Sequence, residues 1–212
     1  MFSQLSEAKA KMAQRKSRSD RRVDLIEAAR RAIIRHGIDR VQLSHVAEEA
    51  GLTSGAVLYH YPDLSELLVE AQHAGMERFY EQRLRQIAAF TDPVAKLVLT
   101  IRSGLPTGPL DPEVRLLNEM GGAAGRNRVY GVLLTSLYDR QVSMYQSILD
   151  TGAALGVFTL TTDPLTISRN LVALEDAYGY RITARHPLIG PDEAAELILS
   201  YARTVTGNDL IH

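Results

Sequence analysis

The residues whose types and spacing can support chemistry lie between positions 44 and 61. Three residues separate Ala47 from Gly51, and five separate Gly51 from Val57. A helix-turn-helix requires a small residue where its two helices press together, a glycine that permits positive φ in the turn, and an aliphatic anchor in the second helix. The pattern therefore predicts a helix-turn-helix, whose chemistry is recognition of duplex DNA.

The second helix of this motif, predicted from Ser54 to about Tyr61, has two unlike sides. Helical geometry places Val57 and Tyr61 on the buried side, whereas Gly55 and Tyr59 point the opposite way. Because small residues begin the helix, its outward side can approach another surface closely. We expect that surface to be the edges of bases in a major groove.

Two kinds of DNA contact are available on the outward side. Ser54 and Ala56 can touch base edges, Ala56 through a thymine methyl group. Tyr59 and His60 can donate hydrogen bonds to phosphates. The alternative is that Tyr59 and His60 pack on neighbouring helices, which would remove both from the DNA.

Signatures of catalysis and metal binding are missing from the sequence. The histidines have no HExxH or comparable ligand spacing, and there is neither a nucleophile elbow nor a P-loop. The glycine-rich run at 121–125 follows a helix and not a strand, which makes it a poor phosphate cradle. The sequence thus predicts no enzyme, no metal and no cofactor. The histidines are His36, His45, His60, His73, His186 and His212.

The composition is that of a folded globular protein. The 212 residues are 45% hydrophobic and 23% charged, which supports a substantial core. There is no cysteine, which excludes disulfides and thiolate sites and is consistent with a reducing cytoplasm. No stretch reaches the roughly 18 apolar residues of a membrane span, and no signal peptide is recognisable. We expect a cytoplasmic protein with no membrane partner.

A basic amino-terminal end is concealed by the net charge of -1. Residues 1–60 hold 11 Lys and Arg against 7 Asp and Glu, which leaves 13 against 18 for residues 61–212. The excess of basic residues at this end favours a flexible basic leader over residues 1–20. We expect DNA phosphates to attract this leader, because each neutralised phosphate releases counterions. A merely solvated tail is the alternative.

Helical periodicity precedes and follows the motif. Apolar residues recur at three- and four-residue spacing over 21–36, and Gly37 is a natural helix stop. A short helix over 43–50 has Gln42 as its weak cap, and a long connecting helix is predicted over 63–90.

Asp-Pro pairs punctuate the remainder of the chain. Proline at the first helical position needs no hydrogen bond there, so each pair marks a helix start. Only residues 157–160 alternate as a strand does, and that stretch is too short to build a sheet. The predicted fold class is therefore all-α. Further helices are expected at about 93–103, from 112 onwards, and at 126–155, 164–185 and 191–206.

Short motifs carry a family resemblance that is dense over residues 21–70. They are Leu25-Ile26-Glu27-Ala28-Ala29, Gly37, Val46-Ala47, Ala50-Gly51-Leu52-Thr53-Ser54-Gly55-Ala56, Leu58-Tyr59-His60-Tyr61-Pro62 and Leu67-Leu68. With these motifs the chain resembles the tetracycline-repressor (TetR) family of bacterial transcription regulators. The resemblance implies a three-helix DNA-binding domain at 21–68 and a helical ligand-binding and dimerisation domain at 69–212.

The resemblance also implies contact positions and shows two departures. Leu64 stands where the family usually has a lysine that meets a phosphate, and Gln42 replaces the usual cap. The basic leader is a candidate to restore the lost phosphate affinity. The family's base- and phosphate-contacting positions fall on Ser44, Thr53, Ser54, Gly55, Ala56, Tyr59 and His60.

The carboxy-terminal domain is expected to enclose a small-molecule effector. Its tyrosines and carboxylates suit an aromatic or cationic effector, although each of them can equally be a satisfied core group or a surface residue. The candidate lining residues are Arg102, Glu119, Tyr130, Tyr138, Met144, Tyr145 and Asp176.

The last two long helices, at about 164–185 and 191–206, are expected to form a homodimer interface. Proteins with this motif normally need two half-sites about one helical turn apart, although the same apolar stripes also suit a core within one chain. The stripes contain Ile167, Leu171, Leu174, Ala194, Leu197, Ile198 and Tyr201.

Together these features predict a homodimeric repressor that a small molecule releases from a palindromic operator. Operator and effector would favour different spacings of the two DNA-reading heads, with the helix at about 64–90 as the lever. Activation is an alternative to repression. A helical protein-interaction module is a second alternative, but it leaves the basic leader unexplained.

Overall fold

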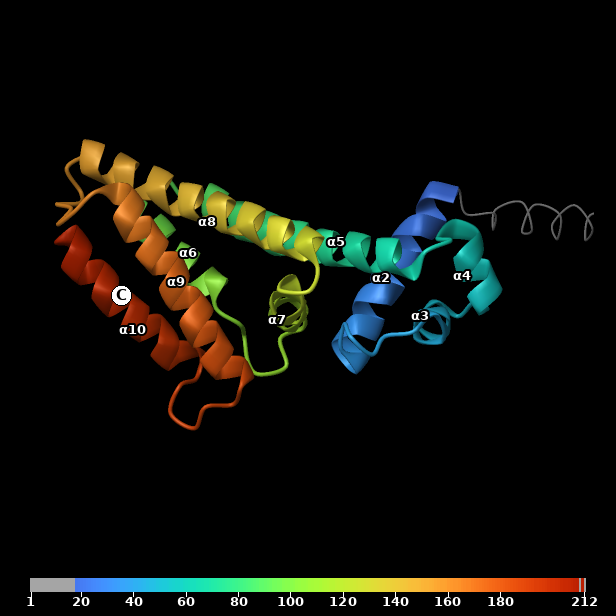
Figure 1. Ribbon diagram of the computed structural model, residues 1–212. Helices are drawn as coiled ribbons and strands as arrows, with labels where there is room; N and C mark the ends of the chain where they lie inside the picture. Colours follow the sequence, from blue (N-terminus) through green and yellow to red (C-terminus); the bar gives the residue numbers. More distant parts are fainter. Residues whose placement is uncertain (1–17, 210, 212) are drawn as a thin grey trace, which may run out of the picture. The chain divides into compact units, whose positions relative to one another are not determined.

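The computed structural model describes residues 18–209 and 211. These residues form helices and no strand (Figure 1), which confirms the all-α prediction. Residues 1–17 of the predicted basic leader lie outside the described residues. The helices are α2 (Arg18–His36), α3 (Leu43–Ala50), α4 (Ser54–His60), α5 (Leu64–Ala88), α6 (Pro93–Gly104), α7 (Pro112–Ala124), α8 (Arg128–Ala154), α9 (Pro164–Thr183) and α10 (Pro191–Thr206).

The chain divides into two compact units, and the division falls between Ala74 and Gly75, inside α5. Unit 1 extends to Ala74 and contains α2, α3, α4 and the first part of α5. Unit 2 begins at Gly75 and contains the rest of α5 and all later helices. The domain boundary predicted after residue 68 stays a prediction.

The three Asp-Pro pairs begin helices, as their sequence predicts. Each aspartate is an N-cap whose carboxylate accepts hydrogen bonds from backbone N–H groups of the first turn, and each proline occupies that turn. The caps satisfy donors that no helical carbonyl can reach. The donors are Val94 and Ala95 for Asp92, Glu113 and Val114 for Asp111, and Thr166 for Asp163.

The turn between α3 and α4 has the features that the sequence pattern predicts for a helix-turn-helix. Gly51 has φ of 64°, and the N–H of Leu52 donates to the Ala47 carbonyl at 2.9 Å. Thr53 caps α4, because its Oγ1 accepts from the N–H of Ala56 at 3.2 Å. Val57 is fully buried beneath the turn. Local backbone chemistry therefore sets the start of α4.

A hydrogen bond that the sequence did not predict compensates for the weak Gln42 cap at the start of α3. The backbone N–H of Gln42 donates to Nδ1 of His45 at 3.1 Å. The His45 ring stacks on the ring of His36, with centroids 3.9 Å apart and planes 10° from parallel. His45 thus satisfies an amide at the helix start and links the end of α2 to α3.

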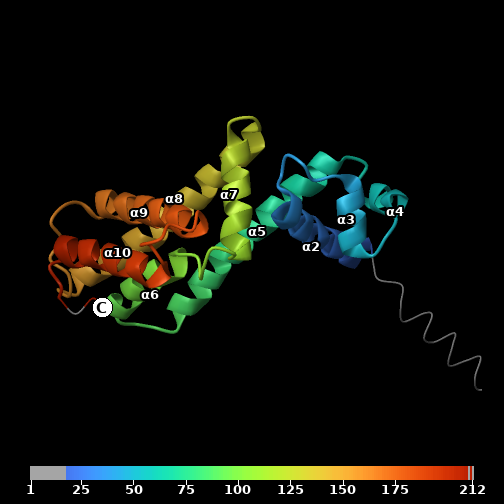
Figure 2. The same cartoon turned by 90° about the horizontal axis from the view of Figure 1, so that it is seen from below.

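Unit 2 is a helical stack with α8 and α9 at its centre. Figure 2 shows α9 and α10 side by side, and α7 packs against both α8 and α9. The apolar stripes of α9 and α10 belong largely to this core: Ile167, Leu171, Ala194 and Ile198 are fully buried, whereas Leu197 is exposed. The intramolecular alternative therefore accounts for most of the stripe residues, and dimerisation stays a prediction.

We predict that Gly51→Ala lowers the free energy of unfolding of unit 1 by about 1 kcal/mol, because only the positive φ opposes a side chain there. A Cβ at Gly51 would meet nothing within 4 Å. Gly55→Ala is the control, since Gly55 lies inside helix α4 and its Cβ would have ordinary contacts. Denaturant unfolding followed by circular dichroism measures both variants. Equal stability of the two variants would contradict the strain argument.

Candidate functional site

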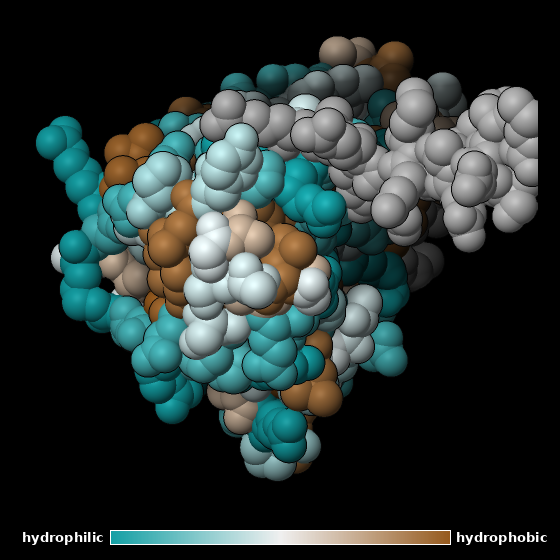
Figure 3. Space-filling model, turned by 90° about the vertical axis from the view of Figure 1, so that its right-hand side faces the viewer, coloured by the Kyte–Doolittle hydropathy of each residue, from teal (hydrophilic) through white to brown (hydrophobic). Residues whose placement is uncertain are grey.

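Helix α4 in unit 1 has the two unlike sides that the sequence predicts. Val57 and Tyr61 are fully buried, while Gly55 is exposed and Tyr59 is 73% exposed. The face drawn in Figure 3 shows weakly polar and apolar side chains gathered among hydrophilic ones. The outward side of α4 is therefore open to a partner.

The remaining predicted contact residues lie on or beside this open side. Ser44 is exposed on α3, Thr53 is exposed at the cap, and Ser54 and Ala56 are half-buried. His60 is also half-buried, with its ring edge-on to Tyr59 at a centroid distance of 5.1 Å. His60 Nδ1 is buried without a hydrogen-bond partner. The sequence leaves open that Tyr59 and His60 pack on neighbouring helices. The His60 ring is partly packed in this way, whereas the Tyr59 ring is not.

Arg22 of α2 anchors the far end of α4. Its Nη2 donates to Glu70 Oε1 of α5 at 2.6 Å, and its Nη1 donates to the His60 carbonyl at 3.3 Å. The guanidinium carbon lies 4.1 Å from the centre of the Tyr61 ring, and the Tyr61 hydroxyl donates to Glu70 Oε2. Burial, with the Glu70 carboxylate, raises the pKa of Tyr61 above its ordinary range. The Arg22 network holds α4 at a set angle between α2 and α5.

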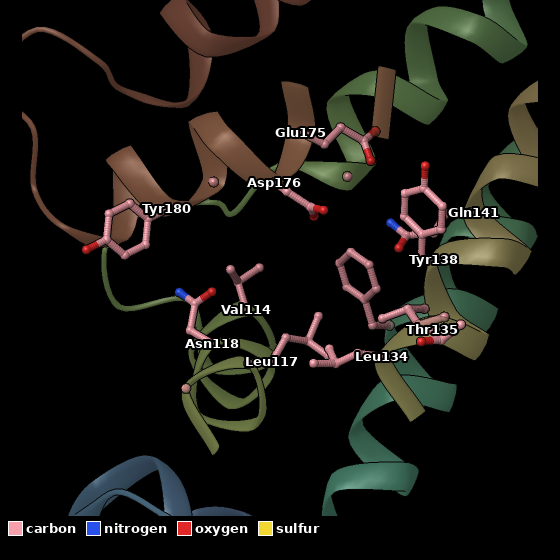
Figure 4. Close-up of a pocket in the computed structure, with 16 residues that line it drawn as sticks. Val114, Leu117, Asn118, Leu134, Thr135, Tyr138, Gln141, Glu175, Asp176 and Tyr180 are labelled. Carbon is pink, nitrogen blue, oxygen red and sulfur yellow. The ribbon is translucent and has the colours of Figure 1, made fainter. Parts of the chain in front are cut away.

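Unit 2 contains a cavity of about 660 Å³ (Figure 4). That volume is typical of small-molecule sites. The walls come from α5, α6, α7, α8 and α9, and they combine apolar and aromatic side chains with a few polar groups. The lining residues are Phe79, Gly104, Val114, Leu117, Asn118, Gly121, Gly122, Leu134, Thr135, Leu137, Tyr138, Gln141, Glu175, Asp176, Gly179 and Tyr180.

A buried ion pair forms one wall of this cavity. Arg83 Nη2 donates to Glu175 Oε1 at 2.7 Å and to the Thr100 carbonyl at 2.9 Å. The hydroxyl of Tyr145 also donates to Glu175 Oε1. Only 1% of Arg83 and 2% of Glu175 are exposed. A Cβ on Gly104 would lie 2.0 Å from Glu175 Oε1, so glycine is required there.

The pKa values of the two carboxyl groups that line the cavity, those of Glu175 and Asp176, are both raised. Burial raises the pKa of Glu175 to about 7, against the opposing attraction of Arg83. Desolvation likewise raises the pKa of Asp176, again with Arg83 opposing, although the Asp176 side chain is open to solvent through the cavity. Burial raises the pKa of the Tyr145 hydroxyl well above its usual value, so that Tyr145 acts as a hydrogen-bond donor.

Similarity to known proteins extends over both units. Residues 25–71 match the family of bacterial regulatory proteins named tetR. The HTH-type transcriptional regulator TtgR of Pseudomonas putida is 32% identical over 105 residues, 47% of this chain and 48% of TtgR. The chain thus spans about half the length of the curated relatives that it matches.

Solved structures share the whole fold. A TetR transcription regulator from Haloarcula marismortui aligns with a TM-score of 0.77 at 25% identity, over 88% of this chain and 98% of that protein. A putative transcriptional regulator from Saccharomonospora viridis, solved in complex with choline, aligns with a TM-score of 0.80 at 24% identity, over 87% and 96% respectively. The amino-terminal domain of the chain belongs to the TetR family.

Two of the predicted effector residues line the cavity, namely Tyr138 and Asp176. Tyr145 lies behind the wall and reaches it through Glu175. Arg102 forms an exposed ion pair with Glu196 at 2.9 Å. The other three do not line the cavity: Tyr130 and Met144 are buried and Glu119 is half-buried.

Sequence reasoning missed four polar residues of the lining, which are Glu175, Gln141, Asn118 and Thr135. One signal was available, because Tyr138, Gln141 and Tyr145 recur at the three- and four-residue spacing of one helix face. Glu175 gave no comparable signal, since its partner Arg83 is 92 residues away in the sequence.

The described residues lack two further features. They contain no cluster of three or more His, Cys, Asp or Glu side chains arranged to hold a metal ion. Among their helices, none combines the length and apolar character that crossing a membrane requires.

We predict that Gly104→Ala lowers the free energy of unfolding by about 3 kcal/mol, because a methyl group there displaces the Glu175 carboxylate and breaks its buried pairing with Arg83. Gly122→Ala is the control, since Gly122 also lines the cavity but its Cβ would meet nothing within 4 Å. Urea denaturation measures both. A Gly104→Ala protein as stable as the control would show that Glu175 does not occupy this position.

Proposed function

We propose that the chain is a DNA-binding transcription regulator, a homodimeric repressor that a small molecule releases from a palindromic operator. The observation that carries this proposal is the open outward side of α4, next to the Gly51 turn, while Val57 and Tyr61 hold the opposite side in the core. Such a helix fits a major groove. The proposal is of a cytoplasmic regulator and not of an enzyme.

The contact roles follow from side-chain type and exposure. Ser54 and Ala56 touch base edges, and Tyr59 and His60 donate to phosphates. The Arg22 network supports this arrangement, because it holds the end of α4 from which Tyr59 and His60 project. The full set of proposed contacts is Ser44, Thr53, Ser54, Gly55, Ala56, Tyr59 and His60.

Selection of bound sites from random duplexes tests this function. We expect a palindrome whose half-sites lie about one helical turn apart. Tyr59→Ala should weaken binding to all sequences alike, because it removes a phosphate contact, and should leave the salt dependence unchanged, because tyrosine carries no charge. Leu110→Ser, at a 63% exposed position in a loop of unit 2, is the control and should bind normally. A protein that ignores every duplex at low salt would refute the proposal.

We infer that the effector occupies the cavity of unit 2. The cavity's volume and mixed lining support this inference, as does the fold shared with the Saccharomonospora viridis protein that was solved with choline. Dimerisation uses the outer faces of α9 and α10, where Leu197 of α10 is 38% exposed. Effector and operator then weaken each other's binding by linkage.

Helix α5 is the proposed lever, and Ala74→Pro tests it. Proline removes a backbone hydrogen bond inside a helix and kinks it, so the variant should bind operator as a dimer yet fail to respond to the compound that releases the unchanged protein. Ala74→Ser is the control. Fluorescence anisotropy of labelled operator, with dimer mass by light scattering, gives the readout. Normal release of Ala74→Pro would exclude α5 as the lever.

A further inference from the structure

The charges around the cavity are unbalanced. Of the described residues that line it, Glu175 and Asp176 carry charge, and both are acids. Arg83 lies behind Glu175 and compensates one of the two negative charges. With both carboxyls ionised, these three groups leave a single uncompensated negative charge at the wall.

One oxygen of Glu175 is left without a hydrogen bond. Oε1 accepts both donors, from Arg83 and Tyr145, whereas Oε2 is buried and has no hydrogen-bond partner among the described residues. Leaving a buried acceptor unpaired costs about 1–3 kcal/mol, and more when it is charged. Because Glu175 lines the cavity, an occupant can supply the missing donor once the carboxylate turns its buried Oε2 toward the space.

Aromatic rings surround the same space. Tyr138 of α8 and Tyr180 of α9 line the cavity together with Phe79 of α5. Figure 4 shows the Asp176 carboxylate directed into the space between Tyr180 and Tyr138, with Glu175 beyond it on α9. Ring faces attract cations, most strongly where water is excluded. The apolar walls also require an occupant with a hydrocarbon body.

A bare metal ion is a poor fit to this site. The cavity of about 660 Å³ is far larger than an ion, and the described residues provide no third carboxylate or imidazole to complete a coordination shell. An anion is disfavoured by two carboxylates on the wall. Among charged occupants, an organic cation is the class that remains.

We propose that the effector is an organic monocation, whose ammonium group binds between Glu175 Oε2 and Asp176 and whose apolar body contacts the aromatic walls. This proposal rests on the proposed function, which assigns the cavity to the effector. Bound in this way, the cation shares the Glu175 carboxylate with Arg83. It thereby weakens the attachment of α5 to α9.

The test compares two probes of nearly equal shape, 4-phenylbutylammonium and the neutral 4-phenylbutan-1-ol. Calorimetric titration of the full-length protein at pH 8 should give at least tenfold tighter binding of the ammonium. Glu175→Gln and Asp176→Asn should each remove most of that preference. Asp139→Asn is the control, because Asp139 is exposed on α8 outside the cavity lining, and it should keep the preference.

The direction of the pH dependence follows from the groups that face Glu175. Arg83 of α5 and Tyr145 of α8 keep their protons between pH 6 and 8, because the pKa of each is raised. Burial places the pKa of Glu175 near 7, so it gains a proton as the pH falls and the ammonium should bind several-fold more weakly at pH 6. The neighbouring Asp176 also has a raised pKa, and Asp176→Asn separates its contribution. Binding of the alcohol should not change.

The outcomes separate this inference from the proposed function. Equal affinity for ammonium and alcohol, or a preference that survives in both Glu175→Gln and Asp176→Asn, would overturn the monocation assignment while leaving operator binding intact. Failure to bind the selected operator would instead overturn the proposed function. Because Glu175→Gln leaves Arg83 without its buried partner, circular dichroism and thermal melting must show a folded protein. If that variant unfolds, the solvent-open Asp176→Asn variant decides.

Discussion

The cavity of unit 2 depends on the buried ion pair between Arg83 and Glu175. Removing both charges from water is strongly unfavourable, and Tyr145 and the Thr100 carbonyl supply part of the hydrogen bonding that offsets this cost, while Glu175 Oε2 stays unpaired. Gly104 leaves the room that the carboxylate needs. These contacts join α5, α6, α8 and α9 at one point. The cavity wall, its negative charge and the unpaired Glu175 oxygen therefore have a common origin.

A second charged network has the corresponding role in unit 1. Arg22 joins the start of α2 to the end of α4 and the start of α5, through the His60 carbonyl and Glu70. The Arg22 network holds Tyr61 in the core of unit 1 and leaves Tyr59 exposed. The two networks share one element: α5 contributes Glu70 to the first and Arg83 to the second.

Local chemistry made much of the fold predictable. Three features depend on backbone groups within a few residues: the Asp-Pro helix starts, the Gly51 turn and the Thr53 cap. Neighbouring residues in the sequence are therefore enough to predict them. The periodicity of α4 indicated which side is buried for the same reason. His45 was harder to predict, since its role as an acceptor for the Gln42 amide also involves stacking on His36 in another helix.

The sequence by itself determined the helices, the helix-turn-helix and the outward residues of α4, because propensity, capping and the 3.6-residue period act over short distances. Only the tertiary structure decided which polar residues form the cavity. Tyr138 and Asp176 were anticipated, but Glu175 becomes a cavity residue through Arg83, 92 positions away, and through the space left by Gly104. Contacts at such separation depend on how whole helices pack, and no local pattern in the sequence encodes them.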